Sequence, residues 1–150
     1  QAFDKIPKPK QKIKFEQVQE VAVVVQHRDG HRVLLRQCEA NQRWAGLWDF
    51  PRFECDIQCS QDLTTLEQQQ IAAETHDLAY VQIDDLIPLT SIKHGVTKYR
   101  ITLNCFSAKL KRDQTAKNPT LQWVALDELD NYPLSTTGRK ICDVLKREHV

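Results

Sequence analysis

The sequence predicts an α+β domain in which a mixed β-sheet packs between helices. Three observations lead to this prediction. Runs of β-branched residues typical of strands recur along the chain, a helical pattern interrupts them midway, and a second helical pattern ends the chain. The length of 150 residues suits one domain, and the fractions of hydrophobic (41%) and charged (27%) residues are ordinary for a globular protein.

The first predicted elements form a hairpin. Val21–Gln26 is a β-branched run typical of a buried strand, and Asp29-Gly30 is a turn signal. Arg32–Gln37 is therefore expected to pair back as a second strand. The next segment, Arg43–Pro51, is dense in aromatic residues and predicts a loop.

A helix is expected after this loop. Either Ser60 or Asp62 can serve as its N-cap, and the helix should run to about Thr75. The remaining predicted strands are Ala79–Ile83, Pro88–Lys93, Tyr99–Leu110 and Leu121–Ala125, with Trp123 in the core. Ala125–Leu129 should lead into a short helix that Tyr132-Pro133 breaks, and a terminal helix capped by Ser135 or Thr136 should run through Leu145.

Basic residues are concentrated in two stretches. Residues 1–17 are predicted to be a basic linker, because prolines interrupt any helix and residues 1–14 carry five lysines against one aspartate, a net charge of 5 − 1 = +4. Since the whole chain has a net charge of +1, the remainder carries 1 − 4 = −3. Ile87–Arg112 contains six basic residues and no acidic one. This distribution fits a protein that meets phosphates on one face.

The five cysteines give no sign of a metal centre. Cys55 and Cys59 form one close pair, but no second close pair follows, so neither a zinc nor an iron–sulfur site is predicted. We expect free thiols in a reducing cytoplasm. No run is long and apolar enough for a membrane span, so no membrane partner is expected. The chain has no methionine, even at position 1, and we therefore expect a fragment of a longer protein.

The aromatic loop and the helix after it carry a family resemblance. Gly46–Pro51, followed by a helix, resembles the entry to the catalytic box of Nudix hydrolases, whose helix glutamates hold Mg²⁺ against a diphosphate. Gln70, Ala73 and Glu74 stand at three of these glutamate positions, so one carboxylate is kept. The resemblance implies a Nudix-like fold over residues 18–150 that has lost its metal and its hydrolytic activity.

A Nudix-like domain with such a box resembles the C-terminal domain of the adenine DNA glycosylase (MutY) family. The resemblance covers nearly the whole chain, from Ile6-Pro7-Lys8 to the terminal helix, and its most specific piece is Trp44–Glu54. In that family, a loop joining two strands of the sheet carries an aromatic–Ser/Thr–His motif that touches 8-oxoguanine.

The corresponding loop here keeps part of that motif. Val96 stands for the aromatic residue, Thr97 for the Ser/Thr and Lys98 for the terminal histidine, while His94 matches the histidine that opens the segment. The resemblance implies that the Thr97 hydroxyl contacts the modified edge of the lesion. The predicted DNA-binding residues are therefore Val96, Thr97, Lys98, His94 and Arg100. Lys98 and Arg100 are predicted phosphate contacts, and for His94 the residues alone favour a structural hydrogen-bonding role at a strand end.

The resemblance implies a division of labour within a longer enzyme. The parent protein would excise adenine opposite 8-oxoguanine in duplex DNA, using an N-terminal catalytic domain that holds a 4Fe-4S cluster. The present chain would bind no cofactor, cleave nothing and work with that domain and with DNA in the bacterial cytoplasm. Two alternatives stay open: a self-standing Nudix hydrolase of oxidised nucleoside triphosphates, and a protein-interaction module whose basic hairpin docks an acidic partner.

Overall fold

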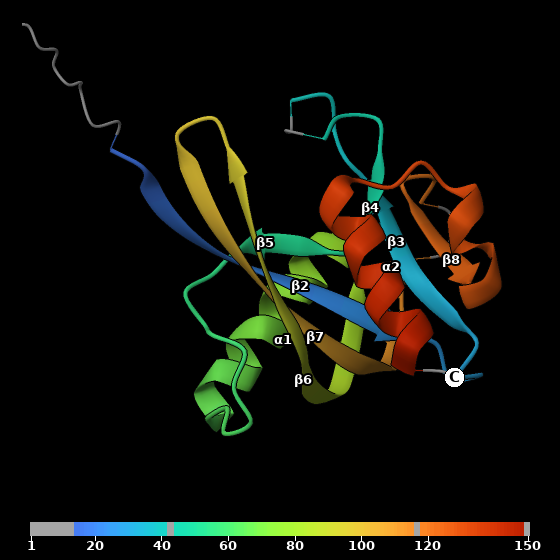
Figure 1. Cartoon of the computed structure of the whole chain (residues 1–150). Helices are drawn as coiled ribbons and strands as arrows, with labels where there is room; N and C mark the ends of the chain where they lie inside the picture. The colour runs from blue at the N-terminus through green and yellow to red at the C-terminus, as the bar shows by residue number, and fades with distance from the viewer. Residues whose placement is uncertain (1–13, 42–43, 116–117, 149–150) are drawn as a thin grey trace, which may run out of the picture.

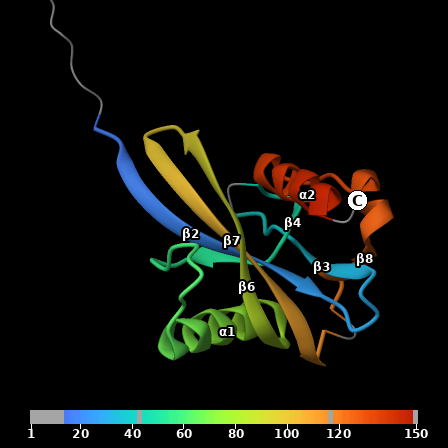
Figure 2. The same ribbon diagram turned by 60° about the horizontal axis from the view of Figure 1, so that its bottom comes forward.

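The computed structural model describes residues 14–41, 44–115 and 118–148, which form one mixed sheet with a helix on each face (Figures 1 and 2). This confirms the predicted fold class. The strands are β2 (Glu16–Gln26), β3 (Arg32–Gln37), β4 (Trp48–Asp49), β5 (Arg52–Glu54), β6 (Val81–Val96), β7 (Tyr99–Asp113) and β8 (Leu121–Ala125), and the helices are α1 (Thr65–Ala79), the 3₁₀ helix η1 (Leu126–Asn131) and α2 (Thr136–Glu148).

The sheet is mixed because β2 runs parallel to β7 and antiparallel to its other partners. The strand order is β4-β3-β2-β7-β6, with β5 paired to β2 and β8 paired to β3. The predicted hairpin of β2 and β3 is present, but the two strands pair only at Gln26 and Val33 before they diverge. Further along β2, β5 takes over as the partner at Glu20–Ala22. The sheet therefore splits beside β5.

The core consists of two layers, one on each face of the sheet. Alternate residues of β2 point to opposite faces, so Val23 packs on the α1 side with Ile71 while Val24 packs on the α2 side with Ile141. Because both faces are covered, β2 reads as an unbroken run of buried residues from Glu20 to Val25. Ile141 and Leu145 of the terminal helix are buried in the layer on the α2 side.

Helix α1 begins later and ends later than the sequence predicted. Its N-cap is Thr64, whose Oγ1 accepts from the Glu67 N–H at 3.0 Å while the Glu67 carboxylate accepts from the Thr64 N–H at 2.9 Å. This reciprocal capping box outcompetes Ser60 and Asp62, which lie in the preceding loop. The helix ends where Tyr80 adopts a left-handed conformation with φ of 57°.

Strand β6 replaces the two strands predicted at Ala79–Ile83 and Pro88–Lys93. Ala79 is the last residue of α1, and β6 runs without a break from Val81 to Val96. Irregular register between Gln82 and Thr90 carries the strand through Asp84, Asp85 and Pro88, across the gap between the two predicted strands. The two strands β6 and β7 form a long hairpin that projects beyond the helices (Figure 1).

Three further differences concern the ends and edges of elements. β2 takes in residues 16 and 17, which the sequence assigned to the basic linker, while residues 1–13 of that linker lie outside the described residues. The aromatic loop contains β4. Trp123 is half-buried at the edge of the core, where its Nε1 donates to Asp113 at 3.0 Å.

In the part of the chain that the structure describes, no helix has the length and apolarity of a membrane span.

Candidate nucleic-acid interface

The residues predicted to contact the lesion lie at the tip of the β6–β7 hairpin. Val96 pairs with Tyr99, so Thr97 and Lys98 form a two-residue connection. Such tight turns usually need a positive φ at the first position, which glycine adopts most easily. Here Thr97 has a φ of 51°.

Thr97 therefore has a strained backbone. A β-branched residue in the left-handed region is an outlier that costs about 1–2 kcal/mol. Its side chain is exposed, and its hydroxyl donates to the Val96 carbonyl at 2.7 Å. That bond uses the one hydroxyl proton and leaves the oxygen lone pairs able to accept a hydrogen bond.

The neighbours of Thr97 differ in exposure. Val96 is half-buried, whereas Lys98 is exposed. The Lys98 ammonium lies 4.0 Å from the Glu16 carboxylate and 5.6 Å from the centre of the Tyr99 ring. An exposed ion pair of this length contributes little to stability, so Lys98 can exchange Glu16 for a phosphate.

Below the tip, Arg100 forms part of a pocket on the α1-facing side of the hairpin. Its guanidinium stacks on the ring of Phe15 at 3.9 Å from the centroid. The pocket has a volume of about 480 Å³ and is also lined by Gln17, Lys93 and Thr102, among others. Arg100 thus lies near the tip, in a stacked arrangement that the sequence did not reveal.

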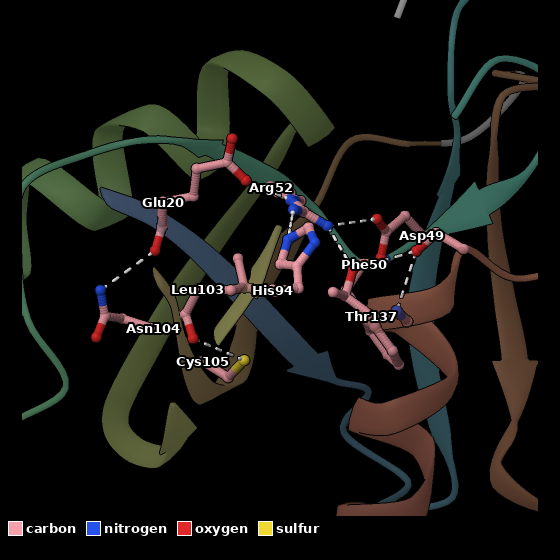
Figure 3. A network of polar contacts seen from close by, with 11 residues as sticks. Glu20, Asp49, Phe50, Arg52, His94, Leu103, Asn104, Cys105 and Thr137 are labelled. Atoms are coloured by element: carbon pink, nitrogen blue, oxygen red, sulfur yellow. Dashed lines mark hydrogen bonds and ion pairs between the residues drawn. The ribbon is translucent and has the colours of Figure 1, made fainter. Parts of the chain in front are cut away.

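His94 lies in the stem of the hairpin and contacts a buried arginine (Figure 3). The Nη2 atom of Arg52 lies 3.1 Å from the Nε2 atom of His94. Because a guanidinium only donates, this geometry requires an imidazole that carries its proton on Nδ1. His94 thereby joins the β6–β7 hairpin to β5, which begins at Arg52.

Arg52 of β5 is the centre of a polar network that joins this strand to four other elements, β2, β4, β6 and α2 (Figure 3). Its side chain is 9% exposed and bonds to Glu20 of β2 at 2.7 Å and to Thr137 of α2. Asp49 of β4 lies 3.4 Å from the same guanidinium. The network therefore fixes the stem of the hairpin against the sheet and against the start of α2.

Asp49 is the most deeply buried carboxylate of this network, with its side chain 4% exposed. Burial raises the pKa of Asp49, and this effect outweighs the opposing charge of Arg52 and the hydrogen bonds from Ser135 and the Phe50 N–H. The charged form is therefore disfavoured in the folded protein relative to the unfolded chain.

We expect Asp49→Asn to remove one component of the pH dependence of stability. Because folding raises the pKa of Asp49, its protonated form contributes to the free energy of unfolding. This contribution is fully present below the pKa of the unfolded chain, about 4, and is lost as the pH rises through the pKa of the folded protein. The free energy of unfolding of the wild type, relative to the variant, should therefore fall from pH 4 upward in urea titrations. Asp130→Asn is the control of opposite sign, because ion pairing with Lys146 lowers the pKa of Asp130. A flat difference for Asp49→Asn contradicts the assignment.

Helix α1 places the box residues above the loop after β5. Gln70 and Ala73 are exposed and Glu74 is half-buried. The Gln70 amide lies 3.7 Å from the Cys55 sulfur, whose pKa is raised by burial first and by the charges of Glu74 and Asp56 to a smaller extent. Cys55 is therefore a protonated thiol at neutral pH.

A comparison with family profiles decides the family. The profile of the NUDIX domain matches residues 21–144, which is most of the chain. The chain belongs to the NUDIX domain family. A comparison with curated proteins gave no match.

Several solved structures are similar to this NUDIX domain. The NUDIX domain of Shewanella oneidensis NrtR, solved with ADP ribose, is 18% identical with a TM-score of 0.67 over 90% of each chain. The MutT protein of Methanosarcina mazei Go1 is 18% identical with a TM-score of 0.66, covering 92% of this chain and 99% of its own. The C-terminal domain of mouse MUTYH, solved with human PCNA, is 22% identical with a TM-score of 0.60, covering 87% and 88%. At these identities the likeness shows the fold alone.

The box helix of this NUDIX domain does not suit a magnesium cluster. Magnesium takes several hard oxygen ligands, usually with more than one carboxylate where it binds a diphosphate. Gln70 offers a neutral amide, Ala73 offers no ligand, and Glu74 is the one carboxylate kept. Among the described residues, no three His, Cys, Asp or Glu side chains converge in a group that could hold a metal ion.

Two features of this NUDIX domain were missed by the sequence reasoning. Asp49 and Arg52 flank Phe50-Pro51 in an otherwise apolar segment, and that placement was the available signal for a buried ion pair. Phe15 lies at the end of the lysine-rich segment, and only the parallel pairing of β2 with β7 brings it to Arg100.

Proposed function

We propose that this NUDIX domain is the C-terminal domain of a MutY-type A/G-specific adenine DNA glycosylase and recognises 8-oxoguanine opposite adenine in duplex DNA. The observation that carries the proposal is the hairpin tip, where an exposed and strained threonine stands among basic residues. Strained backbone is often found at ligand-binding sites. Helix α1 supports a binding role over a hydrolytic one. Of the three positions at which Nudix hydrolases carry metal-binding glutamates, Gln70, Ala73 and Glu74, one keeps a carboxylate.

Recognition would rest on the Thr97 hydroxyl. 8-Oxoguanine differs from guanine at one edge, where it carries an additional oxygen and an N–H. The Thr97 hydroxyl donates to Val96, so its free lone pairs suit the N–H of the lesion. Lys98 and Arg100 would contact phosphates, which position the hairpin without reading the sequence.

The rest of the proposed enzyme would lie outside this chain. A catalytic domain with a 4Fe-4S cluster would flip and excise the adenine, and the present domain would bind the 8-oxoguanine side of the same duplex. The lysine-rich segment before Phe15 would tether the two domains and add nonspecific affinity for DNA. We place this activity in the bacterial cytoplasm, where the thiols stay reduced.

We expect Thr97→Ala to weaken discrimination between duplexes that carry 8-oxoguanine:adenine and guanine:adenine. The loss of one hydrogen bond should cost about 1 kcal/mol, or about fivefold in the ratio of dissociation constants. Thr97→Ser keeps the hydroxyl and should keep the ratio. Fluorescence anisotropy with both duplexes measures this ratio, and an unchanged ratio in the alanine variant would refute the role of Thr97.

The rival function is hydrolysis of an oxidised nucleoside triphosphate. We expect no turnover of 8-oxo-dGTP in the presence of Mg²⁺. Turnover that Glu74→Gln abolishes would contradict the proposal, because it would show that Glu74 still supports metal chemistry.

A further inference from the structure

We propose that the pocket formed by Phe15, Lys93 and Arg100 binds a backbone phosphate of the DNA whose lesion meets the hairpin tip. This inference rests on the proposed function and adds a second contact point. We call it the stem pocket, and its lining includes Phe15, Gln17, Lys93, Gly95, Arg100 and Thr102.

Strand pairing places the polar groups of the stem pocket on one face. Arg100 pairs with Gly95 on β6 and with Gln17 on β2, and Lys93 pairs with Thr102. Side chains directly opposite each other in a sheet share a face, and the face alternates along each strand. The two cations, the Gln17 amide and the Thr102 hydroxyl therefore face the same volume.

Gly95 leaves the space beside Arg100 open. A Cβ atom at this position would meet one atom within 4 Å, the Tyr99 carbonyl oxygen at 3.8 Å. With no side chain opposite it, the Arg100 guanidinium can be approached from the β6 side.

The charges of the stem pocket suit an anion. Within the described residues, no ion pair joins a carboxylate to Lys93 or Arg100. The carboxylate of Glu16, at the start of β2, pairs with Lys98 instead. Glu16 pairs with Tyr99, and Tyr99 precedes Arg100 on β7. Because neighbouring side chains of a strand point to opposite faces, Glu16 and Tyr99 lie on the face of the sheet away from the stem pocket. Phe15 covers one face of the Arg100 guanidinium and leaves its N–H edge available, the edge that binds phosphate in a bidentate manner.

Distance along the strand indicates which phosphate the pocket would take. Arg100 is three residues from Thr97, or roughly 10 Å at the rise of a β-strand. Phosphates of one DNA strand follow each other about 3.4 Å apart along the helix axis. The stem pocket would therefore hold a phosphate about three nucleotides from the lesion.

The test uses the complete 150-residue chain and two 15-base-pair duplexes, one with a central 8-oxoguanine:adenine pair and one with guanine:adenine, titrated at several salt concentrations. We expect Lys93→Gln and Arg100→Gln each to weaken binding of both duplexes several-fold and to reduce the slope of log K against log salt by about 1. Gly95→Leu should weaken binding equally while leaving the charge of the protein unchanged, because its side chain fills the pocket. Arg100→Lys, which keeps the charge, should retain most of the slope.

Lys111→Gln is the matched control, since Lys111 is an exposed lysine on the same strand, eleven residues from Arg100. It should change neither affinity nor slope. If the Lys93, Arg100 and Gly95 variants bind DNA with the affinity and salt slope of the wild type and still prefer the lesion duplex, the phosphate site in the stem pocket is refuted. The lesion-recognition function is not affected by that result. If the wild type binds the two duplexes equally and these variants still bind DNA more weakly, the lesion-recognition function is contradicted. The phosphate site is then still supported. If inorganic phosphate saturates the pocket and DNA binding does not change, the pocket binds free phosphate and not a DNA phosphate. That result overturns the inference.

Discussion

Replacement of Arg52 by methionine should lower the free energy of unfolding by about 3–5 kcal/mol, because it leaves buried carboxylates without their cation. The carboxylates are Glu20 and Asp49, whose side chains are 11% and 4% exposed. Urea denaturation followed by circular dichroism measures the change.

Two further variants test the cause of this loss. Arg147→Met removes an exposed arginine at the end of α2 and should change the free energy of unfolding by less than about 0.5 kcal/mol. The triple variant Glu20→Gln, Asp49→Asn, Arg52→Met removes all three charges and should recover much of the stability. Equal stability of Arg52→Met and the wild type would mean that the network is more hydrated than its burial indicates.

The second large effect is expected for Gly138→Ala at the start of α2. Alanine normally stabilises a helix relative to glycine by about 1 kcal/mol. At this position the added Cβ would lie 3.0 Å from the Ser135 hydroxyl and 3.1 Å from the Asp49 carboxylate. Both atoms are buried and hydrogen-bonded, since Ser135 caps the helix by accepting from the Gly138 N–H at 3.0 Å.

Because neither neighbour can move away cheaply, we expect Gly138→Ala to destabilise the fold by about 1–3 kcal/mol through overpacking. Lys140→Ala, at an exposed position of the same helix, is the control and should have little effect. Thermal melting of both variants provides the comparison. A rise in melting temperature for Gly138→Ala would show that helix propensity dominates and that the contact around Asp49 is loose.

The elements with strong local signals were predictable from the sequence. The valine run of β2, the turn at Asp29-Gly30 and the cap at Ser135 all lie where local chemistry placed them. The start of α1 was missed although its signal was local, because Thr64 and Glu67 make a capping box that was not considered. The continuity of β6 could not be predicted, since its irregular segment is held by pairing with β7 rather than by its own sequence.

The candidate site was predictable at its tip and not at its base. Thr97 lies at the hairpin turn, as the family resemblance implied, but its positive φ depends on the pairing of Val96 with Tyr99. The stack of Arg100 on Phe15 and the bond from Arg52 to His94 each join residues far apart in the sequence. Such contacts follow from sheet topology, which periodicity in a single sequence does not determine.

Lesion recognition and nucleotide hydrolysis can be compared directly in one preparation of the chain. Dissociation constants are measured for duplexes with 8-oxoguanine:adenine and with guanine:adenine, and the same protein is incubated with 8-oxo-dGTP and Mg²⁺. We expect tighter binding of the lesion duplex, a preference that Thr97→Ala reduces, and no release of pyrophosphate or phosphate. Equal affinity for the two duplexes together with Glu74-dependent turnover of the nucleotide would contradict the proposed function.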